Sequence, residues 1–327
     1  MPGRAPRRKS QESLHVVGDR KTRTDQNRSR RRKRWLMTVG GLGLASTLGY
    51  LAVGTYVALQ LTRPGRQAQS AAPADYGLPF DEVTVRSRDG LALAAWFIPA
   101  PDSDRAVLFV HGKDSCRSCE FQGRFVELAG RLQAEGFNIL MIDLRGHGQS
   151  EGRYLTLGEH ERWDVLGAVD WLQWRGFTKI GILGVSLGAA SAVRAAADPQ
   201  GGEVIRALAL DSGFGNLRDA LDRKFVEVSG LPYAFLPGSL LMGRLLHRVD
   251  FNMIRPAHDL PQIKAPVMLI FSEQDDLVPV SHFHAMAAAR PDAEIWLLAD
   301  AGHSTIYAAY PEEYISRVSR FLAQSLS

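Results

Sequence analysis

From residue 83 to the end of the chain, short apolar runs alternate with stretches of helical periodicity. The apolar runs are rich in Val, Ile and Leu and cover residues 83–86, 91–98, 106–111, 138–143, 179–184, 204–211, 267–271 and 294–298. The helical patterns cover residues 122–135, 159–174, 186–197, 281–289 and 311–323. Strands of this composition with helices between them form a mostly parallel sheet that is covered on both faces. The alternation therefore predicts an α/β fold, a mostly parallel eight-stranded sheet flanked by helices, with reactive groups at the carboxyl ends of the strands.

Residues 35–62 form a run of 28 residues without a charged side chain. A helix needs only about 20 apolar residues to cross a membrane, and core helices of soluble domains rarely continue this far without a polar face. The run therefore predicts one transmembrane helix. Within it, Gly41, Ala45 and Gly49 recur every four residues, a spacing that lets two membrane helices approach closely and makes them candidates for self-association.

The formal charge of +4 is distributed unevenly along the chain. Residues 1–34 carry 13 basic and 3 acidic side chains, or +10, and the rest of the chain carries −6. Because basic flanks stay in the cytoplasm, we expect a cytoplasmic N-terminus and an exported remainder, periplasmic if the source is bacterial. Small residues at 68–74 leave a cleaved signal peptide as the rival interpretation, and the arginine run fits a twin-arginine signal poorly.

Composition also limits the class of protein. The pI of about 9.1 comes from the short tail and therefore does not indicate nucleic-acid binding. With 45% hydrophobic residues the chain is not disordered, and with 2 Cys it is not a disulfide scaffold. We divide the chain into a basic tail (1–34), a transmembrane helix (35–62), a linker rich in Pro, Ala, Gly and Gln (63–80) and a folded domain (81–327) with an insertion at 215–262.

A nucleophile is indicated after the fifth apolar run, where the motif G-x-S-x-G spans Gly184, Ser186 and Gly188 and precedes an Ala-rich helical pattern. A Ser on a sharp strand-to-helix turn has its hydroxyl exposed above the sheet, and the glycines leave room for the turn. The helix start also brings backbone N–H groups and a positive dipole end near the hydroxyl, which suits an anionic intermediate. The alternative is a glycine-lined turn with an inert Ser.

A Ser hydroxyl needs a base, and His303 is the candidate among nine histidines. It follows the last apolar run and precedes the last helical pattern, which gives the chain order Ser, acid, His. The acid that orients the imidazole is then sought before it. Asp275 and Asp276 directly follow the seventh apolar run, and Asp211 ends the sixth, so the residues alone leave all three open.

With these residues placed, the chain resembles the α/β-hydrolase superfamily, and most closely the membrane-anchored or cytosolic serine hydrolases described as serine-aminopeptidase-like. The resemblance covers roughly residues 81–325. It rests on the motifs His111-Gly112, Asp143 to Gly152, Gly184 to Gly188, Leu210 to Phe214, Asp275 to Pro279 and Gly302-His303. It implies an α/β-hydrolase fold in which 215–262 form a helical cap.

The resemblance further implies roles for individual residues. The family pattern G-x-x-D-x-x-V-P selects Asp275 as the acid, although Ser272 stands here in place of the leading Gly. The oxyanion hole is implied to consist of the backbone N–H groups of Lys113 and Leu187. The expected reaction is acyl transfer in which Ser186 attacks a carbonyl, and neither a metal ion nor an organic cofactor is expected.

The same resemblance gives structural roles to four polar residues. Arg145 and His147 are expected to hold the loop after the fourth strand, and Glu161 and Asp164 match a structural pattern on the next helix.

Two segments bear on the substrate. The apolar centre of the insertion, residues 226–243, either packs on the sheet domain or serves as a lid for the acyl chain of a lipid-like substrate at the membrane. Cys116 and Cys119 make a poor zinc site and lack the context of a redox dithiol, so in an exported domain they are candidates for a local disulfide that stiffens the oxyanion loop.

The sequence thus predicts a membrane-tethered serine hydrolase that cleaves carboxylic esters or thioesters. A serine peptidase or amidase is the nearest alternative, because the same three residues cleave amides. The third interpretation is a catalytically silent hydrolase fold that serves as a membrane-bound binding module.

Overall fold

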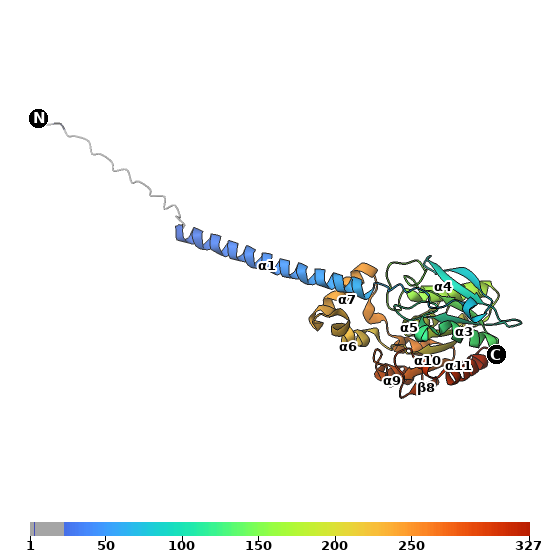
Figure 1. The fold of residues 1–327 in the computed structure, drawn as a ribbon. Helices are drawn as coiled ribbons and strands as arrows, with labels where there is room; N and C mark the ends of the chain where they lie inside the picture. The colour runs from blue at the N-terminus through green and yellow to red at the C-terminus, as the bar shows by residue number, and fades with distance from the viewer. Residues whose placement is uncertain (1–2, 4–22) are drawn as a thin grey trace. The chain divides into compact units, whose positions relative to one another are not determined.

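The computed structural model describes Gly3 and residues 23–327, so most of the predicted basic tail (1–2 and 4–22) lies outside the described residues. The described residues fall into two parts that divide after residue 50. Figure 1 shows the chain coloured from its N-terminus to its C-terminus. The larger part contains the predicted sheet, and we describe it first.

The eight predicted strands are present and form one mixed sheet, mostly parallel, in the order β1-β2-β4-β3-β5-β6-β7-β8. The strands are β1 Asp81–Arg86, β2 Ala92–Ile98, β3 Arg105–Val110, β4 Asn138–Ile142, β5 Lys179–Val185, β6 Ile205–Asp211, β7 Val267–Ser272 and β8 Glu294–Leu298. Only β2 runs antiparallel to both of its neighbours, β1 and β4. The parallel register pairs Val110 of β3 with Gly184 of β5, and Val185 of β5 with Asp211 of β6. The ends of the central strands are thereby brought to one edge of the sheet.

Eleven α-helices are present among the described residues. They are α1 Arg23–Leu61, α2 Glu120–Gly123, α3 Phe125–Ala134, α4 Glu161–Trp174, α5 Leu187–Ala196, α6 Leu217–Ser229, α7 Leu236–His247, α8 Pro256–Asp259, α9 Val280–Ala289, α10 Ile306–Ala309 and α11 Pro311–Ser325. The helix predicted at 122–135 is regular only from Phe125, where α3 begins. The short α2 before it is distorted, because Phe121 and Gln122 have positive φ angles of 54° and 61°, outside the right-handed helical region.

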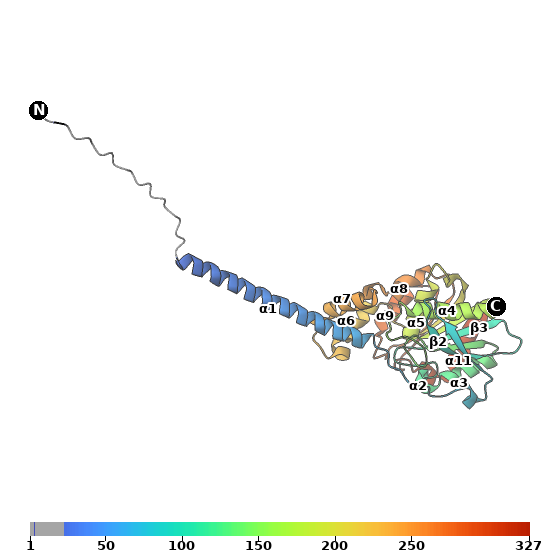
Figure 2. The same ribbon diagram turned by 90° about the horizontal axis from the view of Figure 1, so that it is seen from above.

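Two apolar clusters cover the two faces of the sheet. Leu166 of α4 and Val193 of α5 belong to one cluster, and Leu128 of α3 and Val318 of α11 belong to the other; all four side chains are fully buried. Figure 2 shows these two pairs of helices on opposite sides of the strands. The central strands are therefore buried on both faces, as their continuous apolar sequences require, whereas the edge strands β1 and β8 keep exposed residues.

The predicted transmembrane segment lies within α1 except for its last residue, Thr62, and the stretch Gln26–Leu61 of this helix is long and apolar enough to cross a membrane. A methyl group at Gly41 or Gly49 would meet no described atom within 4 Å, so no other described segment of the chain packs against these two glycines. Self-association through Gly41, Ala45 and Gly49 stays a prediction. The last turns of α1, residues 51–61, belong to the larger part of the chain.

The segment 63–80, predicted as a linker, is hydrogen-bonded to the loop that follows β3. The N–H of Gly65 donates to Oδ1 of Asp114 at 2.6 Å, and the Gln67 amide donates to the Asp114 carbonyl at 2.5 Å. Farther along, the N–H of Ser70 donates to Oγ of Ser118 at 3.0 Å. The segment thus lies along the loop from which the sequence predicts one oxyanion donor.

The insertion at 215–262 contains α6, α7 and α8. The helical segments Leu217–Ser229 and Tyr233–His247, which include α6 and α7, are bent by 117° relative to each other. Several large apolar side chains of these two helices are exposed, among them Val226, Val228, Leu241 and Leu245. In both views α7 lies beside the last turns of α1 (Figures 1 and 2).

Candidate active site

Ser186 lies on a sharp turn between β5 and α5. Its φ of 53° and ψ of −112° are unusual for a residue with a side chain, and its N–H donates to the carbonyl of Asp211 at 2.8 Å. A methyl group at Gly188 would lie 2.1 Å from the Val110 carbonyl oxygen, and one at Gly184 would lie 2.7 Å from the Gly188 carbonyl oxygen. The two glycines of the motif are therefore required by close backbone contacts around the turn.

The structure brings His303 and Asp275 to this Ser. Nε2 of His303 lies 2.9 Å from Oγ of Ser186, and Nδ1 lies 2.7 Å from Oδ2 of Asp275. The other carboxylate oxygen, Oδ1, accepts from the N–H groups of Leu277 and Val278 at 2.9 and 2.7 Å, which fixes the orientation of the carboxylate. The hydroxyl, the imidazole and the carboxylate thus form one chain of hydrogen bonds, the arrangement in which a Ser proton can pass to an imidazole.

The two other candidate acids have different surroundings. Asp276 is exposed. Asp211 is fully buried and accepts from the hydroxyls of Ser212 and Tyr314 at 2.7 and 3.0 Å. Burial raises the pKa of Asp211 to about 7, against the lowering effect of these two hydrogen bonds.

Electrostatics around His303 favour its protonated form. Burial lowers its pKa, but the hydrogen bond and charge of Asp275, with the charges of Asp211 and Glu120, have the larger combined effect, and the pKa is raised. Such an imidazole is a stronger base towards the Ser hydroxyl.

The two predicted oxyanion donors belong to segments that flank Ser186. Leu187 is the first residue of α5, and Lys113 follows Gly112 in the loop after β3. A methyl group at Gly112 would lie 3.2 Å from Cβ of Ser186, which shows how closely this loop passes the hydroxyl-bearing side chain. The Gly112 N–H donates to Oε1 of the buried Glu120 at 2.7 Å.

Two buried histidines connect this loop to the loop after β4. Nε2 of His111 accepts from the N–H of Leu144 at 3.0 Å, and Nε2 of His147 accepts from the N–H of Asp114 at 3.1 Å. Burial lowers the pKa of His111 to about 3, so that it stays neutral and keeps its acceptor nitrogen. His147 therefore holds a loop, as the sequence predicts, and His111 does the same.

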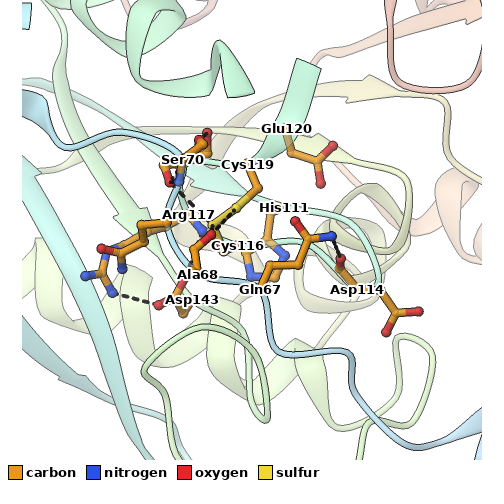
Figure 3. Close-up of a disulfide and its surroundings, with 12 residues drawn as sticks. Gln67, Ala68, Ser70, His111, Asp114, Cys116, Arg117, Cys119, Glu120 and Asp143 are labelled. Carbon is orange, nitrogen blue, oxygen red and sulfur yellow. Dashed lines mark hydrogen bonds and ion pairs between the residues drawn. A yellow bond between two sulfur atoms is a disulfide. The ribbon is translucent and has the colours of Figure 1, made fainter. Parts of the chain in front are cut away.

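The same loop contains a disulfide between Cys116 and Cys119, with Cα atoms 5.0 Å apart (Figure 3). Between the two cysteines, Arg117 is buried and forms an ion pair with the buried Asp143 at 2.7 Å. Glu120, directly after Cys119, is the residue that accepts from Gly112. The disulfide thus encloses one attachment of the predicted oxyanion loop, at Arg117, and directly precedes the other, at Glu120.

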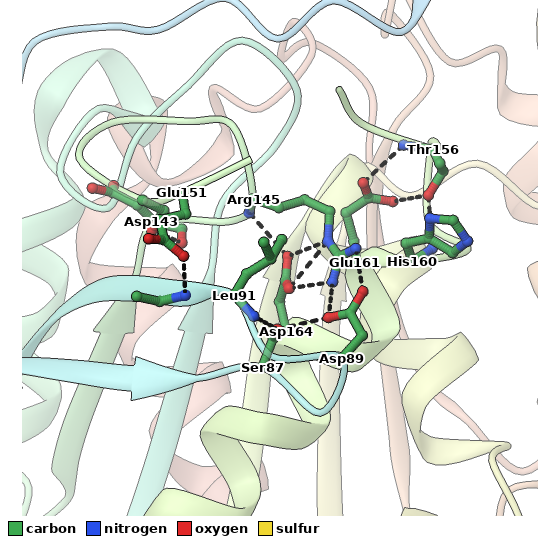
Figure 4. A network of polar contacts seen from close by, with 12 residues as sticks. Ser87, Asp89, Leu91, Asp143, Arg145, Glu151, Thr156, His160, Glu161 and Asp164 are labelled. Atoms are coloured by element: carbon green, nitrogen blue, oxygen red, sulfur yellow. Dashed lines mark hydrogen bonds and ion pairs between the residues drawn. The ribbon is translucent and has the colours of Figure 1, made fainter. Parts of the chain in front are cut away.

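Arg145, in the loop after β4, forms a network of ion pairs (Figure 4). Its guanidinium pairs with Asp164 at 2.7 Å and with Asp89 at 2.8 Å. Glu161, which lies on α4 together with Asp164, accepts hydrogen bonds from the N–H groups of Thr156 and Gly158 at 2.8 Å each. These contacts agree with the structural roles that the sequence implies for Arg145, Asp164 and Glu161.

Sequence reasoning did not find the contribution of Glu120, Asp143 or Tyr314. Glu120 and Asp143 bond to groups 8 and 26 residues away, and Tyr314 bonds to a residue 103 positions away. Of these three residues, only Asp143 had a signal in the sequence, because it begins the motif Asp143 to Gly152 on which the family resemblance rests. Within residues 23–327, no group of three or more His, Cys, Asp or Glu side chains is arranged to hold a metal ion.

Comparison with known proteins places the chain among hydrolases. Residues 107–317 match the model of the alpha/beta hydrolase family. An uncharacterised protein of Mycobacterium tuberculosis is 29% identical over 268 residues, which cover 80% of this chain and 84% of that protein. The lysophosphatidylserine lipase ABHD12 of Danio rerio is 32% identical over 194 residues, or 57% of this chain and 47% of that protein. Among solved structures, the Pyrococcus furiosus esterase Pf2001 is 28% identical, with a TM-score of 0.67, and the match covers 81% of this chain and 100% of that chain.

Proposed function

Since the chain belongs to the alpha/beta hydrolase family, we propose that it is a membrane-tethered serine hydrolase that cleaves carboxylic esters or thioesters. The observation that carries the proposal is the hydrogen-bond chain from Ser186 through His303 to Asp275 at the carboxyl edge of the sheet. The esterase and the lipase among the similar proteins support an ester as substrate rather than an amide. The motifs shared with the serine-aminopeptidase-like branch specify the fold and the three site residues, and they do not specify whether the substrate is an ester or an amide.

The reaction proceeds in two steps. Nε2 of His303 takes the Ser186 proton as Oγ bonds to the carbonyl carbon, and the protonated imidazole returns this proton to the leaving alcohol or thiol as its bond to that carbon breaks. Water then attacks the acyl-enzyme, loses its proton to His303 and releases the acid, and the proton returns to Ser186. Asp275 holds the imidazole in the tautomer with its proton on Nδ1 and stabilises the charged form.

The negative charge that develops on the carbonyl oxygen needs donors. The N–H groups of Lys113 and Leu187 are assigned this role, because their segments flank Ser186 and Leu187 opens α5 with its positive dipole end. The exposed side chains of Val228 at the end of α6 and of Leu241 and Leu245 in α7 support a lid for the acyl chain at a membrane surface.

An activity panel tests this function. Full-length protein in detergent is assayed on matched p-nitrophenyl esters, thioesters and aminoacyl anilides, with Ser186→Ala as the control. Hydrolysis of esters or thioesters that Ser186→Ala abolishes supports the proposal. Cleavage of the anilides alone contradicts it and indicates a peptidase, whereas the absence of any Ser186-dependent turnover indicates a silent binding module.

Topology forms the second half of the proposal. The segment 35–62 is assigned as an uncleaved anchor with its N-terminus in the cytoplasm and the hydrolase domain exported, on the evidence of the basic flank. The Cys116–Cys119 disulfide supports export, because disulfides persist in oxidising compartments. Protease added to spheroplasts is expected to digest the hydrolase domain from outside, and complete protection of the domain would contradict this topology.

A further inference from the structure

The uncharged run of α1 is longer than a membrane requires. A helix crosses the hydrocarbon core with about 20 residues, whereas residues 35–62 number 28. A span that begins at Trp35 is complete near Gly54, and about two turns of apolar helix remain. These are the turns that belong to the folded part of the chain that contains the active site.

The remaining turns pack tightly on the cap. A methyl group at Gly54 would lie 2.8 Å from the backbone carbon of Gly238 in α7, so the two helices cross with their backbones in close contact. Three residues farther along, Val57 and Ala58 are only 2% and 3% exposed, and Val57 belongs to the same apolar cluster as α4 and α5. The end of the helix is therefore part of the hydrolase core.

A buried hydrogen bond fixes the point where α1 ends. The Thr62 hydroxyl donates to the Ala58 carbonyl at 2.7 Å, and it accepts from Nε2 of His247, at the end of α7, at 2.9 Å. The Thr62 carbonyl in turn accepts from the N–H of Leu155 at 2.8 Å. Cap, helix and sheet domain are joined at this residue.

These turns also border a groove of about 330 Å³ beside the predicted oxyanion loop. The groove is lined by Tyr56, Val57, Gln60, Leu61, Lys113, Val228 and Ser229. Lys113 contributes the predicted oxyanion donor and directly follows Gly112, which passes Ser186. Its ammonium group is paired with the Asp114 carboxylate. Val57, Leu61 and Val228 give the groove apolar surface, beside the polar groups of Gln60 and Ser229. One lining residue of the groove is therefore adjacent in sequence to the glycine that passes Ser186.

We propose that the last turns of α1, residues 55–61, form one wall of the acyl-chain groove, with the end of α6 as the opposite wall. The ligand is the acyl chain of an amphiphilic ester from the membrane that α1 enters. The inference rests on the proposed hydrolase function and deepens it, because it makes the anchor helix part of the enzyme. Tyr56 and Val228 are then specificity-determining residues for chain length.

Paired substitutions test the groove in full-length protein in lipid nanodiscs. Val228→Trp narrows the groove and Tyr56→Ala removes part of its wall. Val226→Trp and Leu59→Ala are the matched controls, since these residues lie on the same helices with similar exposure, 52% and 49% against 60% and 62%, and do not line the groove. The readout is the ratio of kcat/KM for p-nitrophenyl decanoate to that for p-nitrophenyl acetate, and fluorophosphonate labelling of each variant verifies that its site is assembled.

The wild-type protein is expected to prefer decanoate. Val228→Trp and Tyr56→Ala are each expected to lower the decanoate-to-acetate ratio by about tenfold or more, because about two methylene groups of the acyl chain then lose their apolar contacts. The control variants are expected to keep this ratio within about twofold of the wild-type value. Equal decanoate-to-acetate ratios in the lining and control variants, or a wild-type preference for acetate, would overturn the inference. The proposed hydrolase function would still hold in that case if the wild-type protein is labelled and turns over ester. A wild-type protein that is neither labelled nor active would overturn both.

Discussion

The carboxylate of Glu120 accepts a hydrogen bond from the backbone N–H of Gly112 at 2.7 Å. Gly112 directly precedes Lys113, the predicted oxyanion donor, and Glu120 directly follows the disulfide. A buried side chain thereby positions the main chain that is to stabilise the tetrahedral intermediate. Glu120 acts through Gly112 and is a positioning residue.

Replacement of Glu120 tests this role. Glu120→Ala leaves the Gly112 N–H without its partner and lets the loop move, so kcat is expected to fall by about tenfold or more, within the range seen when an oxyanion donor is lost, with a smaller change in KM. Glu120→Gln keeps an acceptor oxygen and is expected to retain most of the activity. Steady-state kinetics on a short-chain ester measure both. An alanine variant with wild-type kcat would show that Glu120 does not position the loop.

The disulfide is expected to stabilise the same loop. It closes a short loop, residues 116–119, and the chain-entropy model gives about 2 kcal/mol for a loop of this size. Cys116→Ser/Cys119→Ser is expected to lose about this much free energy of unfolding and part of kcat. Chemical denaturation and ester kinetics, with and without a reductant, provide the measurement. The reductant should affect the wild-type protein and leave the double variant unchanged; an equal effect on both would point to another cause.

The pH dependence of kcat/KM is expected to follow His303. The neutral imidazole is the base, and its pKa is raised above the ordinary 6.5, so activity rises with pH and levels off only above that value. Asp211→Asn removes one of the carboxylates that raise this pKa, and the rising limb should therefore move to lower pH. Asp276→Asn, an exposed neighbour of Asp275, is the control and should leave the limb in place. A shift to higher pH in Asp211→Asn would contradict this electrostatic explanation.

Arg145 is expected to matter for stability. Its side chain is 3% exposed and pairs with the fully buried Asp164, so Arg145→Met leaves a buried carboxylate unpaired, at a cost of about 3–5 kcal/mol. Arg131 pairs with Glu312 at the surface, where the side chains are 38% and 80% exposed, and Arg131→Ala is expected to cost about 0–1 kcal/mol. Urea denaturation of both variants gives the comparison, and equal losses would refute it.

The strands could be predicted from sequence because most of them are apolar runs between loop residues, and even the edge strand β1, with the sequence DEVTVR, keeps alternating valines. Each of the eight predicted runs is a strand in the structure. The cluster of Ser186, Asp275 and His303 could be anticipated because each follows a strand whose carboxyl end lies at the same sheet edge. Both predictions depend on local patterns and on the topology they impose.

Contacts between distant residues could not be predicted in this way. The sequence predicted a linker at 63–80, but its composition carries no signal for the hydrogen bonds of Gly65 and Gln67 to Asp114, which depend on where two loops meet in space. The start of α3 was misplaced because the positive φ angles of Phe121 and Gln122 arise where the chain leaves the disulfide loop, and apolar periodicity carries no signal for them. The packing of Gly54 on Gly238 likewise joins two segments that are remote in the sequence.

The central claim is that Ser186 is the nucleophile of an acyl-transfer reaction. Full-length protein is incubated with a fluorophosphonate, and its intact mass and labelled peptide are measured by mass spectrometry, beside Ser186→Ala and His303→Ala. One phosphonyl group on Ser186, absent in Ser186→Ala and formed far more slowly in His303→Ala, is the predicted result. A wild-type protein that stays unlabelled, or a label that persists in Ser186→Ala, would contradict the account.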